Sequence, residues 1–302
     1  MPMKAMILAA GLGTRLRPLT LRRPKALVPV GNRPVIDQVI EYLKVHGVTE
    51  IVVNAHHRHE HIVTHLDSSG HMDLKIEVRI EPKILGTGGG IKNTEDFWDT
   101  DSFFVINADI LSDIDLTDAY AVHKKARNLA TLILHDHEPF NQIRVDDRLN
   151  ITDIAPENHA GRLAFTGIHI IEPELLSHIK KGVYSNIIDC YRELIKAGKP
   201  IRGTLAEGHR WRDIGSIESY RLANKDALKG EPSLVGPCCH MDASVKLTDW
   251  VVIGAKAIIE QDVEIRRSIL WENVSIKKGV KVIDSIVTAS REVQSDLING
   301  IL

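Results

Sequence analysis

Residues Lys4 to Val30 read KAMILAAGLGTRLRPLTLRRPKALVPV, and this stretch decides how the fold begins. An apolar run is followed by Gly11 and Gly13, and five basic residues and three prolines lie between Ala9 and Val30. A glycine-rich turn after a strand presents bare backbone N–H groups, which suit phosphate. Thr14 can add a hydroxyl donor, Arg15 a two-pronged guanidinium and Lys25 a compact positive charge. The stretch therefore predicts a strand that ends in an anion-binding loop.

The segments after this loop alternate between strand-like and helix-like patterns. Short continuous apolar runs such as FFVI at Phe103–Ile106 are typical of strands covered on both faces. The predicted fold class is α/β, with a Rossmann-like, mostly parallel sheet flanked by helices. The expected strands are Lys4–Ala9, Glu50–Asn54, Lys75–Ile80, Ser102–Ile106 and Ala130–Leu134. The expected helices are Val35–Val45, His59–Leu66, Gly88–Thr94, Leu116–Arg127, Ser185–Ala197 and Ile217–Leu228.

Near the C-terminus the apolar period changes to six. One stripe contains Val245, Val251, Ala257, Val263 and Ile269 and, after a slip of one residue, Val274, Val280 and Ile286. A second stripe contains Ile253, Ile259, Ile265 and Trp271. Hexapeptide periodicity predicts a short left-handed parallel β-helix, suited to stacking, oligomerisation or allosteric control. With 228–233 as a linker, we predict a catalytic domain at 1–229 and a β-helix domain at 234–302.

Composition limits the partners and the compartment. The formal net charge is −2, which argues against a dedicated nucleic-acid binder. The three cysteines lack metal-ligand or pairing spacing, which favours a reducing cytoplasm. The N-terminal apolar run is too short for a signal peptide, and no run reaches membrane length. We therefore expect a cytoplasmic protein with no membrane partner.

The other common phosphate motifs do not fit the loop. A dinucleotide-binding fingerprint needs a third glycine where this chain has Leu16, and a P-loop needs a terminal Gly-Lys-Ser/Thr. The stretch GLGTRLRPLT…PKALVPVGNRPVI instead closely resembles the signature of the sugar-1-phosphate nucleotidylyltransferases. The resemblance continues over about 220 residues through LGTGGGI, VINADI, FTGIHII and WRDIGSIESY. Members that also carry a hexapeptide β-helix, such as mannose-1-phosphate guanylyltransferases, are the most similar.

This resemblance implies a reaction between a nucleoside triphosphate and a sugar 1-phosphate that yields a nucleotide sugar and pyrophosphate. Such chemistry needs positioning and charge neutralisation more than a protein nucleophile. The resemblance implies Arg15 and Lys25 as catalytic residues, and Asp109 and Asp213 as ligands of Mg²⁺. It implies nucleotide contacts from Ala10, Gly11, Gly13, Thr14, Glu81, Gly86, Thr87 and Gly88, and sugar contacts from Asn107, Glu157 and Gly167. Gly88–Gly90 would let the nucleotide approach the backbone.

Two departures and several alternatives stay open at this stage. Ala108 stands where many members have glycine, and the usual Glu-Lys-Pro is replaced, so Arg162 or Arg144 becomes a candidate anchor for the sugar phosphate. Guanylyl transfer to mannose 1-phosphate is the leading prediction. The alternatives are uridylyl transfer to glucose, N-acetylglucosamine or N-acetylmuramate 1-phosphate, and a catalytically silent regulatory subunit.

Two histidine features suggest other functions. An acyltransferase would have to use His240 alone. His57, His61 and His65 lie at helical spacing and could bind a transition metal, although a solvated polar face is the commoner use of such a pattern. A homo-oligomer formed through the β-helix is also expected.

Overall fold

The computed structural model describes residues 3–71 and 73–302, which form two compact units interleaved in sequence. Unit 1 contains the chain up to Leu12, Pro24–Ala26 and Ile36–Arg212. Unit 2 contains Gly13–Arg23, Leu27–Val35 and Asp213–Leu302. The first strand of the C-terminal repeat begins at Ser233, close to the predicted linker. Part of the N-terminal signature therefore belongs to the same compact unit as the C-terminal repeat.

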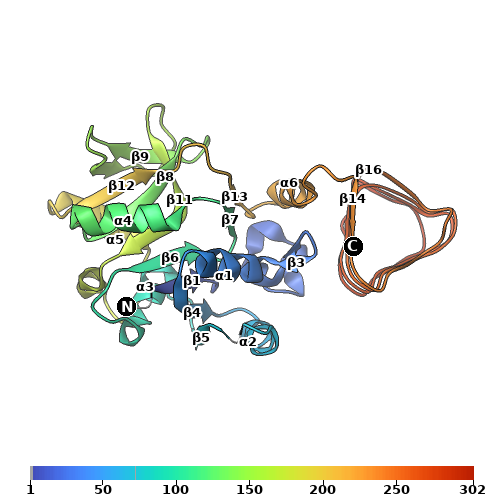
Figure 1. Ribbon diagram of the computed structural model, residues 1–302, viewed down its shortest axis with the longest axis horizontal. Coiled ribbons are helices and arrows are strands. Elements are labelled where there is room, and N and C mark those ends of the chain that lie inside the picture. Colours follow the sequence, from blue (N-terminus) through green and yellow to red (C-terminus); the bar gives the residue numbers. More distant parts are fainter. Residues whose placement is uncertain (1–2, 72) are drawn as a thin grey trace. The chain divides into compact units, whose positions relative to one another are not determined.

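Unit 1 is built on a mixed, mostly parallel sheet (Figure 1). The central strand β1 (Met3–Leu8) pairs in parallel with β4 (Val48–Ala55) and β6 (Phe103–Asn107), and β5 (Lys75–Ile80) extends the sheet beyond β4. On the other side of β6, β11 (Leu163–Ile171) runs antiparallel. The remaining strands are β8 (Ala130–His135), β9 (Asn141–Val145), β10 (Ile151–Ile154) and β12 (Ile201–Leu205). The predicted α/β class is confirmed.

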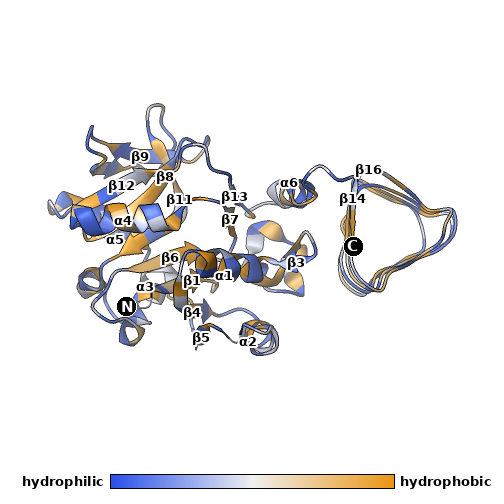
Figure 2. Cartoon of the chain, in the orientation of Figure 1, coloured by the Kyte–Doolittle hydropathy of each residue, from blue (hydrophilic) through white to orange (hydrophobic). Residues whose placement is uncertain are grey.

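The predicted helices are present with ends shifted by at most a few residues. They are α1 (Val35–Val45), α2 (His59–Ser68), α3 (Gly86–Lys92), α4 (Leu116–Ala126), α5 (Ile187–Lys196) and α6 (Ile217–Ala227). Side-chain caps begin three of them, because Asp115, Asn186 and Ser216 each accept a hydrogen bond from a backbone N–H of the first turn. Figure 2 shows apolar stretches in the sheet and a mixture of polar and apolar residues along helices such as α4.

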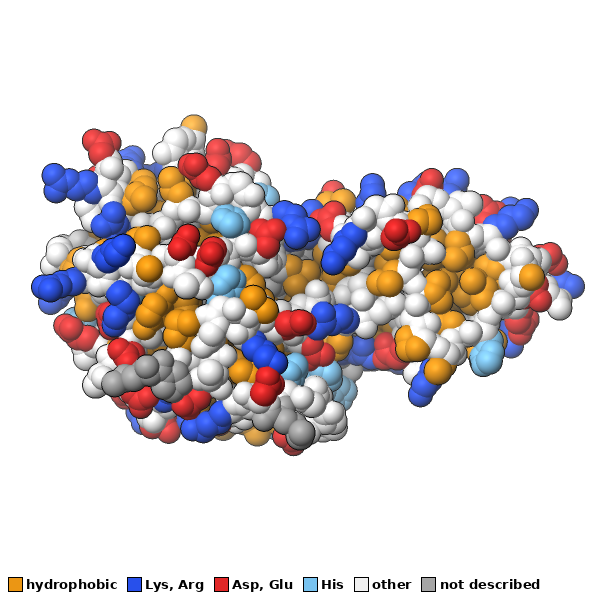
Figure 3. All heavy atoms as spheres, in the orientation of Figure 1, with side chains coloured by type: hydrophobic (Ala, Val, Ile, Leu, Met, Phe, Trp, Pro, Cys, Tyr) orange, Lys and Arg blue, Asp and Glu red, His pale blue; other side chains and the backbone are white. Residues whose placement is uncertain are grey.

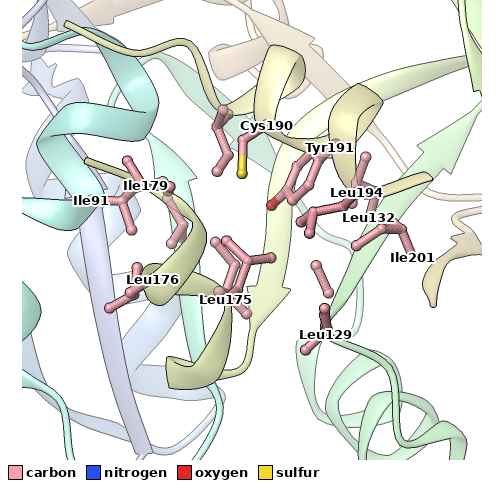
Figure 4. Close-up of a cluster of buried hydrophobic side chains, with 14 of the residues drawn as sticks. Ile91, Leu129, Leu132, Leu175, Leu176, Ile179, Cys190, Tyr191, Leu194 and Ile201 are labelled. Carbon is pink, nitrogen blue, oxygen red and sulfur yellow. The ribbon is translucent and has the colours of Figure 1, made fainter. Parts of the chain in front are cut away.

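Helix α5 packs its apolar face into the core of unit 1 (Figure 4). Tyr191 and Leu194 of α5 meet Leu175 and Leu176 of the 3₁₀ segment η5 (Pro173–His178). Each such buried side chain contributes roughly 1.5–3 kcal/mol. The hydroxyl of Tyr191 lies 2.5 Å from Nδ1 of His169, and burial lowers the pKa of His169 to about 3. The imidazole is therefore neutral and serves as an internal hydrogen-bonding partner.

The C-terminal part of unit 2 is a parallel β-helix whose coils superimpose as a triangle in Figure 1. One face contains β14 (Ser233–Val235), β16 (Lys246–Ile253), β18 (Glu264–Leu270), β20 (Lys281–Ile283), β21 (Ile286–Val287) and β23 (Leu297–Ile298). Another contains β15 (His240–Met241), β17 (Ile258–Ile259), β19 (Ser275–Ile276) and β22 (Glu292–Val293).

The register of these strands explains the irregular step in the repeat. Ser233 pairs with Val251, 18 positions on, whereas Ile269 pairs with Ile286, 17 positions on. Three hexapeptides make a full coil, so the shorter coil accounts for the one-residue slip in the apolar stripe. The stripe positions from Val251 onward are buried, which confirms the predicted β-helix.

Several short elements complete the two units. Two 3₁₀ turns, η1 (Thr14–Leu16) and η2 (Leu19–Leu21), precede a hairpin of β2 (Pro29–Val30) and β3 (Arg33–Pro34). A third 3₁₀ turn, η3 (Lys25–Leu27), lies between η2 and β2 in the chain. A fourth, η4 (Glu95–Phe97), follows α3. Strand β13 (Trp211–Asp213) pairs with β7 (Ile110–Ser112).

The described surface mixes charges of both signs. Figure 3 shows acidic and basic side chains interspersed over the visible face, in keeping with the near-neutral net charge. Among the described residues, none of the helices has the length and apolarity needed to traverse a lipid bilayer.

Candidate active site

The loop of residues 11–23, which we call the signature loop, is compact. Gly13 adopts the left-handed conformation (φ 62°), and its carbonyl oxygen accepts hydrogen bonds from the Leu16 N–H (3.0 Å) and the Thr20 hydroxyl (2.8 Å). Leu16 and Leu19 are buried, whereas Thr14 and Arg15 are exposed. The buried leucines and the closing hydroxyl hold the turn that presents the two polar side chains.

Arg15 and Asp213 lie against the same small residue of unit 2. A Cβ at Gly215 would overlap Oδ2 of Asp213 and would lie 3.1 Å from a guanidinium nitrogen of Arg15. Gly215 therefore leaves the space that brings a predicted phosphate-binding arginine beside a predicted metal ligand. The two residues are almost 200 positions apart in the sequence, and the structure brings them together.

Lys25 and Asp109 form an ion pair within unit 1. Asp109 follows β6, at the carboxyl ends of the parallel strands, where open α/β sheets bind ligands. The side chains are 19% and 16% exposed, so the pair is partly shielded yet reachable. An ammonium group has three donors, and its bond to Asp109 leaves two for other oxygens. The structure thus joins a predicted catalytic cation to a predicted metal ligand.

A buried carboxylate braces the end of β1. Oε1 of Glu81 accepts a hydrogen bond from Nδ2 of Asn54 (2.7 Å), and the Oδ1 of Asn54 accepts one from the Ala9 N–H (2.8 Å). Oε2 of Glu81 accepts the Leu85 N–H (3.0 Å). Glu81 is only 1% exposed. Both of its oxygens are engaged inside the protein, so the side chain supports the loops where β1 ends and α3 begins.

The glycines of α3 are required by internal packing. Added Cβ atoms at Gly88 and Gly89 would lie 2.8 Å from the Ser185 hydroxyl oxygen and 2.7 Å from the Val183 carbonyl oxygen. The Ser185 carbonyl oxygen accepts the N–H groups of both glycines. The Gly90 position faces Asn54 and Glu81. The segment 183–186 therefore occupies the face of Gly88 and Gly89 that we expected to receive the nucleotide.

Gly86 and Thr87 also contact this segment. A Cβ at Gly86 (φ 73°) would overlap the Ser185 carbonyl, and the Thr87 hydroxyl oxygen accepts the Ile187 N–H (2.9 Å). By contrast, nothing lies within 4 Å of a Cβ placed on Gly11, which is exposed. Packing therefore accounts for the glycines of α3, whereas a Cβ on Gly11 of the signature loop would meet only open space.

This contrast gives a paired prediction. Gly89→Ala should destabilise the protein by about 1–2 kcal/mol, because the clash with the Val183 carbonyl outweighs the helix propensity gained. Gly11→Ala should change stability by less than about 0.5 kcal/mol yet raise the KM for the nucleoside triphosphate. Urea unfolding and steady-state kinetics on both variants check the pair. Equal stability losses in the two variants would contradict the conclusion that packing requires Gly89 but not Gly11.

Two predicted sugar-site residues lie together at the end of the sheet. A Cβ on Gly167 (φ 78°) would lie 2.6 Å from Nδ2 of Asn107, so glycine is needed for the approach of this amide. The pairing of β11 with β8 is irregular between Phe165 and His169, which marks a local distortion of the strand. The carbonyl oxygen of Thr166 accepts the indole N–H of Trp211 (2.8 Å).

An aromatic cluster that the sequence did not reveal surrounds Trp211. The rings of His135 and His137 stack 5.0 Å apart, and both meet Trp211 edge-on at 4.5 and 5.2 Å. Burial, reinforced by the neighbouring His137, lowers the pKa of His135 to about 4. The His135 side chain is therefore uncharged near neutral pH. The sequence feature that could have indicated His135 is its position as a polar residue at the end of an apolar strand.

The remaining candidates lie elsewhere in unit 1. Glu157 is exposed in the turn between β10 and β11. Arg162 donates to Asp153 (2.7 Å) and to the Gln142 carbonyl (2.9 Å), and this hydrogen bond lowers the pKa of Asp153. Arg162 is thus engaged within its own hairpin, and Arg144 is exposed on β9.

The histidine alternatives have ordinary surroundings. Nε2 of His65 lies 2.7 Å from Oδ1 of Asp37, which ties α2 to α1. In residues 3–71 and 73–302, no three His, Cys, Asp or Glu side chains are grouped to hold a metal ion. His240 is exposed on β15.

Comparison with known proteins adds independent information. The family model described as nucleotidyl transferase matches residues 4–230. The chain is 31% identical over 272 residues to a mannose-1-phosphate guanyltransferase of Aspergillus oryzae, covering 81% of this chain and 73% of the relative. It is 28% identical over 338 residues to a UTP–glucose-1-phosphate uridylyltransferase of Synechocystis, covering 94% of this chain and 87% of the relative.

The structural comparison agrees with the sequence comparison. A putative glucose-1-phosphate thymidylyltransferase from Bacillus anthracis superimposes with a TM-score of 0.66 at 26% identity, over 74% of this chain and 95% of that chain. These matches confirm the resemblance identified from the signature motifs. The family model covers most of the chain and includes the loop, Asp109 and Asp213, and the chain therefore belongs to the nucleotidyl transferase family.

Proposed function

We propose that the protein joins a nucleoside triphosphate to a sugar 1-phosphate and releases pyrophosphate. The observation that carries this proposal is the Lys25–Asp109 pair at the end of β6, which sets a cation beside a carboxylate where ligands of such sheets bind. Relatives that act on mannose 1-phosphate and on glucose 1-phosphate support the substrate class. Guanylyl transfer to mannose 1-phosphate is the leading assignment, and uridylyl transfer is the alternative.

The reaction is a displacement at the α-phosphorus. An oxygen of the sugar phosphate forms a new bond to this phosphorus, and the bond to the bridging oxygen breaks, so pyrophosphate leaves with the bonding electrons. A sugar phosphate is already a competent nucleophile, so no protein nucleophile is needed. The protein has to hold two anions together and to balance the charge that develops on the leaving group.

Each candidate residue has a part in this scheme. Arg15 would grip triphosphate oxygens through parallel hydrogen bonds, with Thr14 and the backbone at Ala10, Gly11 and Gly13 beside it. The two free donors of Lys25 would bind phosphate oxygens. Asn107 and Gly167 would contact the sugar, and Glu157 or Arg144 could join them. Glu81, Gly86, Thr87 and Gly88 would shape the nucleotide site through the internal contacts described above.

Asp109 and Asp213 have the chemistry that Mg²⁺ requires. Carboxylate oxygens are its preferred protein ligands, and one or two carboxylates suffice because water and phosphate oxygens complete the octahedron. Asp109 retains solvent exposure, which leaves room for an ion. When bound, the ion would supply additional neutralisation of the phosphate charge. The pairing of the two aspartates stays a prediction from the sequence.

The assembly and the compartment are further proposals. Met241 and Ile258 are 43% and 50% exposed on the β-helix, and this apolar surface supports a homo-oligomer formed through that domain. The free cysteines of the described chain support a reducing, cytoplasmic environment. Sedimentation at micromolar concentration tests the first point, and a monomer at all concentrations would contradict it.

The substrate assignment is tested with a matrix of five nucleoside triphosphates against several sugar 1-phosphates. Pyrophosphate release with Mg²⁺ is expected to be fastest for GTP with mannose 1-phosphate. A maximum for UTP with an amino-sugar or glucose phosphate would move the assignment to the uridylyl alternative. Absence of release for every pair would overturn the proposed catalysis and favour a regulatory subunit.

A further inference from the structure

Arg23, near the end of the signature loop, is held by the β-helix. Its guanidinium nitrogens Nη1 and Nη2 contact Oε2 (3.4 Å) and Oε1 of Glu272, and its carbon Cζ lies 4.8 Å from the ring centre of Trp271. The Arg23 and Glu272 side chains are 24% and 33% exposed, so solvent screens their attraction only in part. A two-pronged ion pair and a cation–π contact thus fix the same side chain.

Trp271, which contacts Arg23, also forms a hydrogen bond with a buried residue of unit 2. Its indole N–H donates to the hydroxyl of Tyr220 on α6 (2.8 Å), and that hydroxyl donates to the carbonyl oxygen of Pro29 (2.8 Å). Tyr220 is fully buried, and burial raises its pKa, so the phenol keeps its proton. A single hydroxyl therefore links a β-helix strand end to the hairpin that follows the loop.

The hairpin has two further attachments. Nδ2 of Asn32 donates to the Ile253 carbonyl of β16 (2.8 Å), and Oδ1 of Asn224 on α6 accepts the Gly31 N–H (3.0 Å). Nδ2 of Asn224 donates a hydrogen bond to the Tyr220 carbonyl oxygen (3.0 Å). The β-helix and α6 therefore hold the chain on the C-terminal side of the signature loop.

The loop itself can transmit this restraint. The Thr20 hydroxyl closes onto Gly13, and Leu16 and Leu19 are buried, so these contacts restrain the segment from Gly13 to Thr20, which Arg23 closely follows. Arg15 lies within this segment, beside Asp213. A shift of Arg23 would therefore displace the guanidinium of Arg15.

We propose that Glu272 and Trp271 are positioning residues for triphosphate binding, acting through Arg23 and Tyr220. The first coils of the β-helix are then part of the scaffold of the signature loop, in addition to any role in assembly. This inference rests on the proposed function, because it assigns the consequence to the triphosphate contact made by Arg15.

The test compares Glu272→Gln with Glu260→Gln as a matched control. Glu260 is a partly exposed β-helix residue that pairs with Lys277 (3.1 Å), on another face of the coil. Glu272→Gln is expected to raise the KM for the triphosphate about tenfold, since charge-assisted bonds are roughly twice as strong as neutral ones. The KM for the sugar phosphate should stay constant. Glu260→Gln should change neither value.

A double-mutant comparison separates positioning from general stability. If Glu272 acts through the loop, the effects of Glu272→Gln and Arg15→Lys on triphosphate KM should be less than additive. Additive effects, or equal changes in both substrate constants, would overturn the inference. If Glu272→Gln fails to fold, Tyr220→Phe removes only the hydroxyl that links Trp271 to Pro29, and the same kinetic constants are measured on it.

The wild-type protein distinguishes the two possible failures. Calorimetric titration with GTP–Mg²⁺ and UTP–Mg²⁺, together with turnover, reports on the proposed function alone. A wild type that neither binds nor uses a triphosphate refutes the proposed function and, with it, the premise of this inference. A wild type that is active while Glu272→Gln keeps its triphosphate KM refutes only the positioning role.

Discussion

Asp109→Asn is expected to reduce turnover by about a thousandfold while the protein remains folded. The carboxylate lies at the end of β6, bonded to Lys25, and an amide would keep the shape of the side chain but lose the negative charge. The orientation of the Lys25 ammonium and the proposed metal binding both depend on that charge. The stability change should be small, about 1 kcal/mol, because the pair is partly exposed and asparagine still offers an oxygen.

The measurement is single-turnover kinetics at increasing Mg²⁺ concentration, with thermal unfolding beside it. Asp99→Asn is the control, because Asp99 also forms an ion pair with a lysine, Lys4 (2.9 Å), but its side chain is 65% exposed. That variant should keep the wild-type rate. Asp213→Asn should resemble Asp109→Asn. A nearly normal rate in either variant would remove that aspartate from the metal site.

The second large effect is expected at Arg15. Arg15→Ala should reduce kcat/KM by about a hundredfold or more, because the charged donor that we propose for the triphosphate is lost. Arg15→Lys should recover only part of the loss, since a point charge cannot make two parallel hydrogen bonds. Stability should be nearly unchanged because the side chain is exposed.

Arg17 supplies a matched control two residues away. It is also exposed and belongs to the same loop, but it is not the arginine placed beside Asp213. Arg17→Ala should change kcat/KM by no more than about threefold, as expected for a general electrostatic contribution. Equal losses in Arg15→Ala and Arg17→Ala would indicate that the loop acts only through its total charge.

The local pattern of the sequence was enough to predict most of the elements. Helix α1 begins and ends where the apolar period indicated, and the strands of the α/β sheet follow the short apolar runs. The six-residue stripe predicted the β-helix, including the slip that the register explains. Such features are determined by residues close in the chain, whose spacing dictates which face can be buried.

The site was predictable only in its composition. Motifs predicted Arg15, Lys25, Asp109 and Asp213 as site residues. They did not predict that Lys25 pairs with Asp109 or that Arg15 lies beside Asp213. The glycines of α3 show the same limit. Their sequence predicted close approach, and the approaching group is the segment 183–186.

The sequence by itself therefore determined the α/β class, the β-helix and the chemical groups available for phosphate binding. Only the tertiary structure decided that Arg23 meets Glu272, 249 positions away, and that Tyr220 joins Trp271 to Pro29. The physical reason is that periodicity records which faces are buried. The partner of a buried or charged group depends instead on how distant segments are packed, and no local pattern encodes that choice.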